Sequence, residues 1–411
     1  MGAHPLTSRF DQPIDREGSG ALKFDGRAQT FGTTEVTPMW VADMDFAVPE
    51  AVSQALQARV AHPVFGYALA PESLYQALMD WLHTQHDWHV PREWIVLTPG
   101  VVPSLNLVVA ALTQPGDGVI VQPPVYFPFF SAATGQQRRL LENPLRLVND
   151  ATGQPQYQMD MDHLTVCAQQ ARLLLLCSPH NPVGRVWQTA ELEALLGIAE
   201  AHDLIILSDE IHADLVYPDA PPHQPLSRLS AQGVADSELA SSHRIITAVS
   251  PSKTFNIPGL GLSALIVPNA QHRQAIQRHL TTLGVSVTNP LNMAAFEAAY
   301  RGGHAWQRAL LDYLQDTRDA AIAYIQSELP SIKAVAPQAT YLLWLDCRAL
   351  QLDDDALKHF FIQEAQLGLS PGAMFGHGGE GFMRMNIATP KANVMAALAQ
   401  LKTALSRKDL A

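Results

Sequence analysis

Five runs of consecutive apolar residues constrain the fold of this chain more than any other feature of its sequence. They cover residues 94–98, 118–122, 172–177, 204–208 and 244–250, and each has the length of a short strand. Continuous rather than alternating apolarity favours strands buried on both faces, as in a parallel sheet between helices. Helical patterns such as 49–60, 103–112 and 189–202 alternate with the runs, so the sequence predicts a doubly wound α/β fold.

The pattern changes after about residue 285. Two long helical patterns cover 291–301 and 304–329, followed by strand patterns at 341–346 and 382–387 and a helix over 391–406. This order predicts a second, smaller α+β domain. We expect residues 49–288 to form the large domain, and residues 1–48 and 289–411 to form an N-terminal arm and the small domain.

Composition excludes several classes of protein. The chain has 411 residues, 47% of them apolar and only 16% charged, which argues against disorder. Its net charge of −12 disfavours nucleic-acid and anionic-membrane partners. No apolar run approaches the roughly 18 residues of a spanning helix, and the first residues show no secretory h-region. We therefore expect a cytoplasmic enzyme with no membrane partner.

Cysteine and histidine give no sign of a metal site or a disulfide framework. The three cysteines, Cys167, Cys177 and Cys347, are scattered, and no HExxH or CxxC motif is present. We therefore expect neither a resident metal nor structural disulfide bonds, and the chemistry must come from other residues.

Lysine usage singles out one position. The chain has seven lysines against twenty arginines, and Lys253 is the only lysine between Lys23 and Lys333. Arginine cannot lose its proton or form a Schiff base, whereas lysine can do both. The alternative interpretation is chance in a lysine-poor chain, and this count alone does not decide between them.

The turns after the first two apolar runs carry residues suited to a flat, phosphorylated ligand. In an open α/β sheet, ligands bind beyond the carboxyl ends of the strands. After residues 94–98, Gly100 lets the backbone approach closely, and Val101 and Val102 can offer N–H groups at a helix N-terminus. After residues 118–122, a proline-rich turn presents Tyr126. Each feature alone is equally typical of an ordinary turn.

The other three turns add an amide, a carboxylate and an amine. Asn181, Asp209 and Lys253 follow the third, fourth and fifth runs, on the same predicted sheet edge. Asp209 has the alternative interpretation of a helix cap. Together with the phosphate cradle and the aromatic ring, the set matches the needs of pyridoxal 5′-phosphate (PLP). The lysine forms a Schiff base, and the carboxylate keeps the pyridine nitrogen protonated.

The sequence also resembles a known family. Asn181-Pro182 with Gly184, Asp209-Glu210 and the SPSKT stretch around Lys253 are similar to markers of the fold-type I, aminotransferase-like PLP enzymes. More closely, the chain resembles the MalY/PatB group of cystathionine β-lyase-like carbon–sulfur lyases, from which it departs at Phe24, where tryptophan is usual. The matching stretches, in chain order, are DREGSGALKFD, PMWVADMDFAVP, VFGY, TPGVVPSL, PPVYFPF, SPHNPVGRVW, SDEIHADLVY, SPSKTFNIPGLG, ATYLLWLDCR and MRMNIATP.

The resemblance implies the fold-type I PLP-dependent transferase fold and a role for each site residue. Lys253 would form the Schiff base and move the substrate's α-proton. Asp209 would face the pyridine nitrogen, and Asn181 would meet the phenolic oxygen, with His212 sharing that hydrogen bond. Tyr126 would stack on the cofactor ring.

The resemblance also implies how phosphate and substrate are held. Arg384 would pair with the α-carboxylate of an amino-acid substrate, for which its planar fork is suited. Tyr67 would reach the phosphate of the neighbouring subunit, so a homodimer with shared active sites is expected. The remaining phosphate contacts would come from Gly100, Val101, Val102, Ser250 and Ser252.

Two positions favour a lyase over an aminotransferase. Three residues after the aspartate, aminotransferases often have tyrosine where this chain has His212, and eight residues after the lysine they often have arginine where it has Gly261. The expected reaction is β-elimination from L-cystathionine or related cysteine S-conjugates, giving a thiol, pyruvate and ammonia. A class I/II aminotransferase and a PLP-binding regulatory protein are the alternatives, and no motif encodes the choice directly.

Overall fold

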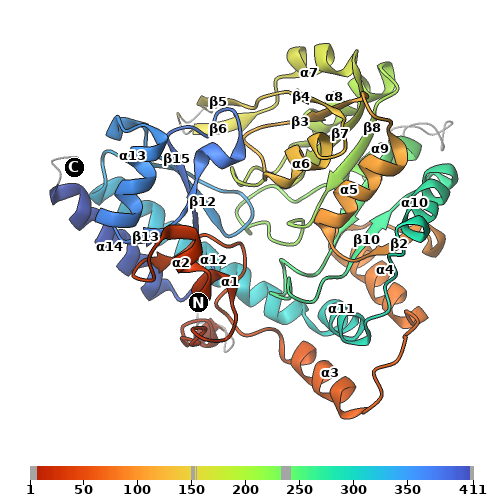
Figure 1. The fold of residues 1–411 in the computed structure, drawn as a ribbon, viewed down its shortest axis with the longest axis horizontal. Helices are drawn as coiled ribbons and strands as arrows, with labels where there is room; N and C mark the ends of the chain where they lie inside the picture. The colour runs from red at the N-terminus through yellow and green to blue at the C-terminus, as the bar shows by residue number, and fades with distance from the viewer. Residues whose placement is uncertain (1–6, 150–152, 154, 233–241, 408–411) are drawn as a thin grey trace.

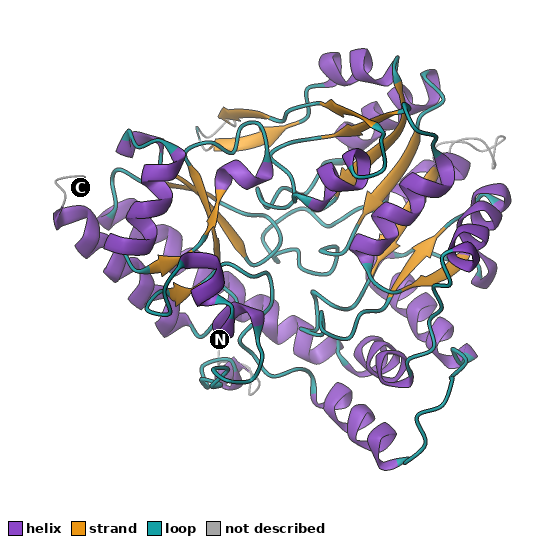
Figure 2. Cartoon of the chain, viewed as in Figure 1, coloured by secondary structure: helices purple, strands orange, loops and turns teal. Residues whose placement is uncertain are grey.

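The fold is described from a computed structural model, in which residues 7–149, 153, 155–232 and 242–407 are placed well enough to describe. Two sheets dominate this part of the chain, one on each side of a central region of loops (Figures 1 and 2). The larger sheet has the strand order β2-β10-β9-β8-β7-β3-β4, and the smaller has the order β11-β12-β15-β14.

All five predicted strands lie in the larger sheet. Its neighbouring strands run parallel, except that β10 is antiparallel to both β9 and β2. The carboxyl ends of the five predicted strands therefore lie at one edge, where β10 begins. The predicted α/β fold class is confirmed, although β10 was not predicted. The strands are β2 (Ile95–Thr98), β3 (Gly118–Val121), β4 (Arg139–Glu142), β7 (Ala171–Cys177), β8 (Ile205–Asp209), β9 (Ile245–Val249) and β10 (Ser263–Ile266).

The apolar run in β7 shows why these strands are apolar on both faces. Leu173 and Leu175 are buried in the core beneath α5 (Val101–Leu112), α6 (Pro128–Thr134) and α10 (Ala270–Thr282). Leu174 and Leu176 point to the opposite face and pack beneath α7 (Met161–Ala168) and α8 (Thr189–Ala201). Side chains alternate along a strand, so two covered faces require apolar residues at every position.

Helix α5 begins earlier than its sequence pattern predicts. The predicted start was residue 103, but Val101 is the first helical residue and Gly100 is the N-cap, with φ of 142°. Only glycine adopts that backbone angle readily. Pro103 is tolerated in the first turn because N–H groups there have no partner within the helix. The earlier start leaves the N–H groups of Val101 and Val102 at the helix N-terminus.

The N-terminal arm packs on the smaller sheet. Phe10, Met39 and Phe46 share a core with this sheet and with α12 and α14, and β1 (Thr37–Pro38) pairs in parallel with β13 (Leu367–Gly368). The arm also carries the short helices α1 (Leu22–Asp25) and α2 (Arg27–Phe31). The remaining elements of this side are β11 (Lys333–Val335), β12 (Leu342–Asp346), β14 (Ser370–Pro371), β15 (Phe382–Asn386), α12 (His304–Glu328), α13 (Asp354–His359) and α14 (Lys391–Arg407).

A group of helices borders the β2 edge of the larger sheet. Helices α3 (Glu50–Ala61), α4 (Glu72–His86) and α11 (Pro290–Gly302) pack together there and share a core with β2 and β10 (Figure 1). Because α11 follows residue 288 and yet packs beside the larger sheet, the predicted domain boundary stays a prediction. Outside both sheets, β5 (Arg146–Asn149) pairs with β6 (Pro155–Gln158), and α9 covers Leu226–Gln232.

No described helix combines the length and apolarity needed to cross a membrane. No cluster of three or more histidine, cysteine, aspartate or glutamate side chains in the described ranges is arranged to hold a metal ion.

Candidate active site

A cavity of about 330 Å³ opens at the carboxyl edge of the larger sheet. Arg384 lies next to it, with Nη1 3.3 Å from Oδ1 of Asn181. Tyr67 does not contribute to the cavity of its own chain, because 98% of its surface is exposed. The cavity therefore gathers most of the predicted site residues from turns far apart in the sequence. Ten of them line it: Gly100, Val101, Val102, Tyr126, Asn181, Asp209, His212, Ser250, Ser252 and Lys253.

Lys253 lies four residues after β9, with its amine inside the cavity. Its Nζ donates a hydrogen bond of 2.6 Å to the backbone carbonyl of Ala42. Burial and the positive charge of Arg384 lower the pKa of Lys253 to about 8. A lysine with a lowered pKa has a larger neutral fraction near neutral pH, so it can serve as a nucleophile and as a base.

Asp209 is the last residue of β8 and is almost fully buried. Its Oδ1 accepts a hydrogen bond of 3.1 Å from the N–H of Ile211. Burial, with a further contribution from the charge of Glu210, raises the pKa of Asp209 to about 7. A buried carboxylate is costly without a cation or a strong donor. This carboxylate is therefore suited to a ligand with a cationic N–H.

Arg384 reaches the cavity edge from β15 of the smaller sheet. Its Nη2 donates to the carbonyl of Trp40 at 2.8 Å and to Oγ of Ser370 at 3.2 Å, while the guanidinium lies 4.9 Å from the ring centre of Phe375. Burial lowers the pKa of Arg384 to about 10, which still leaves it charged at neutral pH. In the described part of the chain its buried Nε has no hydrogen-bond partner.

His212 gives the cavity an uncharged imidazole. Burial and the positive charge of Lys253 lower its pKa to about 3, so the ring is neutral at physiological pH. Its edge faces the ring of Tyr341, with centres 6.2 Å apart. Its Nδ1 is buried, and no hydrogen-bond partner for it is found among the described residues. A neutral imidazole can donate or accept a hydrogen bond, according to its tautomer.

The end of the cavity at α5 combines a helix N-terminus with two serines. Ser250 Oγ donates to the carbonyl of Leu262 at 2.9 Å and accepts from the N–H of Ser252 at 3.2 Å. Gly261, the neighbour of Leu262, approaches the Pro99 turn so closely that an added Cβ would lie 2.8 Å from the Pro99 carbonyl oxygen. Free N–H groups at a helix N-terminus suit an anion such as phosphate.

These residues fit PLP. Its aldehyde needs an amine, its pyridine nitrogen a carboxylate and its phosphate a cradle of N–H and hydroxyl donors, and all three are present at one cavity. The buried carboxylate of Asp209 and the orphaned Nδ1 of His212 are polar groups for which such a ligand would supply partners. When bound, PLP supplies a ring that delocalises the electron pair left at the substrate's α-carbon.

Some residues at the cavity were not predicted. The Ala42 carbonyl accepts from Lys253 and also from the Tyr341 hydroxyl, at 2.9 Å. Cys177 lines the cavity, and its Sγ accepts the N–H of Asn181 at 3.4 Å. Ala42 and Tyr341 lie in two of the family-like stretches, which was the available signal. A backbone carbonyl has no sequence signature of its own, so its role emerged only from the structure.

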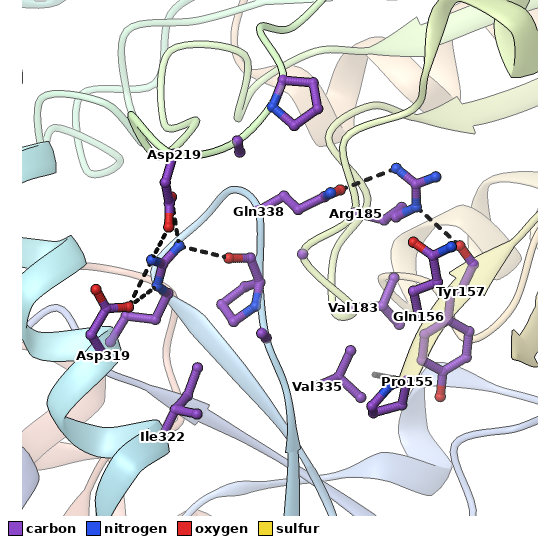
Figure 3. A pocket seen from close by; sticks show the side chains of 16 residues that line it. Pro155, Gln156, Tyr157, Val183, Arg185, Asp219, Asp319, Ile322, Val335 and Gln338 are labelled. Atoms are coloured by element: carbon purple, nitrogen blue, oxygen red, sulfur yellow. Dashed lines mark hydrogen bonds and ion pairs between the residues drawn. The ribbon is translucent and has the colours of Figure 1, made fainter. Parts of the chain in front are cut away.

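A second cavity, of about 380 Å³, is lined by β6, α12, the end of β11 and the turns after β7 and β8, and it contains none of the predicted site residues (Figure 3). Two arginines line it, and both have protein partners. Arg318 pairs with Asp219 and Asp319, and Arg185 donates to Gln338 Oε1 at 3.1 Å. These contacts use both arginines within the protein, and they join α12 and the turn after β11 to the turns that follow β8 and β7.

Fold and site together define an α/β enzyme of the aminotransferase type. Residues 34–401 match the family model described as aminotransferase class I and II, and the chain belongs to this family. Cystathionine beta-lyase PatB of Bacillus subtilis (strain 168) is 38% identical, with 97% of this chain and 100% of that protein covered. Protein MalY of Escherichia coli (strain K12) is 33% identical, with 96% and 98% covered.

A solved structure gives the same picture. Cystalysin from Treponema denticola, whose crystal structure contains PLP, superposes with a TM-score of 0.90 at 33% identity, covering 97% of this chain and 99% of that one. The resemblance to the MalY/PatB group, predicted from sequence stretches spread along the chain, is thereby confirmed.

Proposed function

We propose that this chain is a PLP-dependent carbon–sulfur β-lyase that converts L-cystathionine or related cysteine S-conjugates into a thiol, pyruvate and ammonia. The observation that carries the proposal is the convergence of Lys253, Asp209 and Arg384 on one cavity. The similarity to a cystathionine beta-lyase across nearly the whole chain supports the choice of reaction.

Each of these residues has a separable task. Arg384 binds the α-carboxylate of the substrate and so fixes the rotation about the bond to the α-carbon. Lys253 Nζ takes the α-proton, for which its lowered pKa suits it. Asp209 holds the pyridine nitrogen in its protonated form, which a buried carboxylate favours. These roles are shared by elimination and transamination.

Gly261 supports elimination over transamination. The position where aminotransferases often have arginine has no room for a side chain, because a Cβ there would lie 2.8 Å from the Pro99 carbonyl oxygen. A phosphate at this end would therefore be held by backbone N–H groups and hydroxyls, and not by a guanidinium from this position. The match to the class I and II aminotransferase model makes transamination the second candidate.

The deciding experiment uses the purified holoenzyme and L-cystathionine without any keto acid. We expect pyruvate and free thiol in equal amounts, measured together. The Lys253→Ala variant is the matched control and should release neither. Turnover that requires a keto acid, with accumulation of the pyridoxamine form and no thiol, would reject the lyase in favour of an aminotransferase.

We also propose that the enzyme is a homodimer with shared active sites. Val64, Phe65, Tyr67 and Leu69 lie on one loop after α3, and each is more than half exposed in the single chain. Contiguous exposed apolar residues are typical of an interaction surface.

Sedimentation analysis should give a dimer. Inactive Lys253→Ala subunits mixed with weakly active Tyr67→Ala subunits should regain activity, since the mixed dimer carries one intact site.

A further inference from the structure

Lys23 is the most deeply buried lysine of the described chain, and the proposed function gives it no role. It lies on α1 with 0% of its surface exposed. Its Nζ lies 2.8 Å from Oδ2 of Asp45 and 3.9 Å from Oδ1 of Asp43. A buried ammonium group is tolerated only with such partners. The first half of the N-terminal arm is therefore fastened to residues 43–45, near its end, by a largely buried ion pair.

Arg16 completes the cluster. Its Nη2 lies 2.7 Å from Oδ2 of Asp43, and its Nη1 lies 2.6 Å from Oδ1 of Asp45. We call Arg16, Lys23, Asp43 and Asp45 the ion quartet. It contains two positive and two negative side chains, so its formal charges balance. Each carboxylate contacts both cations, which makes the geometry of residues 43–45 dependent on residues 16–23.

The loop between the two cations is folded by its own hydrogen bonds. The Asp25 carboxylate accepts from the N–H groups of Gly18 at 2.8 Å and Gly20 at 2.6 Å. This closure brings Arg16 and Lys23 to the same two carboxylates. In the stretch DREGSGALKFD, Arg16 and Lys23 thus serve the ion quartet, and Asp25 closes the loop between them.

The segment held by the quartet carries the contacts of two proposed functional residues. The Ala42 carbonyl accepts from Lys253 Nζ at 2.6 Å, and the Trp40 carbonyl accepts from Arg384 Nη2 at 2.8 Å. The Trp40 indole Nε1 donates in turn to the carbonyl of Lys23, at 3.0 Å. Segment 40–46 therefore lies between the two cations of the quartet, Arg16 and Lys23, on one side and the amine and guanidinium of the site on the other.

We propose that Lys23 is a positioning residue for the active site: through the ion quartet it fixes segment 40–46, whose carbonyls hold Lys253 and Arg384. Lys23 is not among the residues that line the cavity. The proposal rests on the proposed roles of Lys253 and Arg384, and it holds whether the enzyme eliminates or transaminates.

The test compares Lys23→Met with the double variant Lys23→Met/Asp45→Asn, both as holoenzymes. The single variant leaves a carboxylate short of a cation. The double variant restores the charge balance and is the more certain of the two to fold. In both we expect kcat/KM for L-cystathionine to fall between about tenfold and 100-fold, with KM raised and kcat lowered, while PLP content stays at the wild-type level.

A spectroscopic measurement separates two effects of removing Lys23: the loss of its positive charge and the loss of its hold on segment 40–46. Asp43 favours the protonated form of the Lys253 nitrogen. With Lys23→Met, the carboxylates are less neutralised, so the pH at which the cofactor absorbance changes should rise. In the double variant that pH should return toward the wild-type value, while kcat/KM remains low because the anchor is still missing.

Lys391→Met is the matched control. Lys391 also forms a lysine–aspartate pair, with Asp316 at 2.8 Å, but at the surface, so kinetics and spectrum should not change. A double variant with wild-type kcat and KM would overturn the proposal and leave the quartet a purely structural feature. Failure of the wild-type enzyme to release pyruvate would instead count against the proposed reaction, and the same variants would then be compared by transamination.

Discussion

Two lysines of this chain are removed from bulk water in opposite ways. Lys23 is fully buried and contacts two carboxylates, Asp45 at 2.8 Å and Asp43 at 3.9 Å. Lys253 is half-buried in a cavity, and within the described part of the chain its amine donates a hydrogen bond to the Ala42 carbonyl. Carboxylates compensate the charge of an ammonium group, whereas a carbonyl does so only in part. The first lysine therefore fastens two segments, and the second keeps a proton that it can give up.

The same contrast extends to the aspartates. Asp45 meets both cations of the ion quartet, whereas burial and the charge of Glu210 leave Asp209 with a pKa raised to about 7. Charged side chains that pair with each other fix the local structure, whereas a buried carboxylate without a cation is available to bind a ligand.

Replacing Lys253 by alanine should lower turnover by about 10⁴-fold or more, because nucleophile and base are lost together. The variant should retain some PLP non-covalently. Borohydride reduction of the wild-type holoenzyme, followed by peptide mapping, should find PLP on Lys253 alone. A label on any other lysine would contradict the assignment of Lys253 as the reactive lysine and, with it, the contrast with Lys23.

Replacing Asp209 by alanine should lower kcat by about 10²- to 10³-fold and weaken PLP binding, since the ring nitrogen loses the carboxylate that keeps it protonated. Asp209→Glu should be milder. Steady-state kinetics and PLP titration measure both effects. Near-normal turnover of Asp209→Ala would show that this aspartate has only a structural role, like the aspartates of the ion quartet.

Replacing Arg384 by lysine should raise KM by about tenfold and also lower kcat, because an ammonium group cannot reproduce a two-pronged contact with the α-carboxylate. The cofactor absorbance should stay near that of the wild type. An effect on PLP affinity alone would show that Arg384 holds the cofactor and not the substrate.

The smallest effect concerns stability and pH. The pKa of Lys253 is lowered from its ordinary 10.5 to about 8 by burial and by Arg384. Between these values the unfolded chain binds more protons than the folded one, so stability from this group rises with pH. In cofactor-free protein, wild type should gain stability relative to Lys253→Met, by a few kcal/mol at most, as pH rises from 8 to 10.5. A constant difference in melting temperature across that range would rule this out.

Elements that depend on a local residue pattern could be predicted from the sequence. Contacts between residues far apart in the chain could not. Leu173 to Leu176 are apolar at consecutive positions, so β7 was readable as a doubly covered strand. β10 (Ser263–Ile266) was not predicted although it is as long as β2 and β3, because it begins with a serine and follows a glycine-rich turn. The turns carrying Asn181, Asp209 and Lys253 were predictable from their place after strands.

The contacts between the two sheets could not be predicted in that way. Trp40 and Arg384 are 344 positions apart, and so are brought together only by the fold. Every residue has a backbone carbonyl group, so the sequence does not mark that of Ala42. Only its position in the fold makes it the acceptor for Lys253. Lys23 was visible as one of few lysines, but its burial depends on where the arm packs.

The close approach of Gly261 to Pro99 also constrains the evolution of this enzyme. A Cβ at that position would lie 2.8 Å from a backbone oxygen, which cannot move as a side chain can. An arginine could be accepted there only after the Pro99 turn had shifted. The order of substitutions therefore matters: a lineage or a designer seeking an aminotransferase-like phosphate site from this chain must change the turn first and the glycine second.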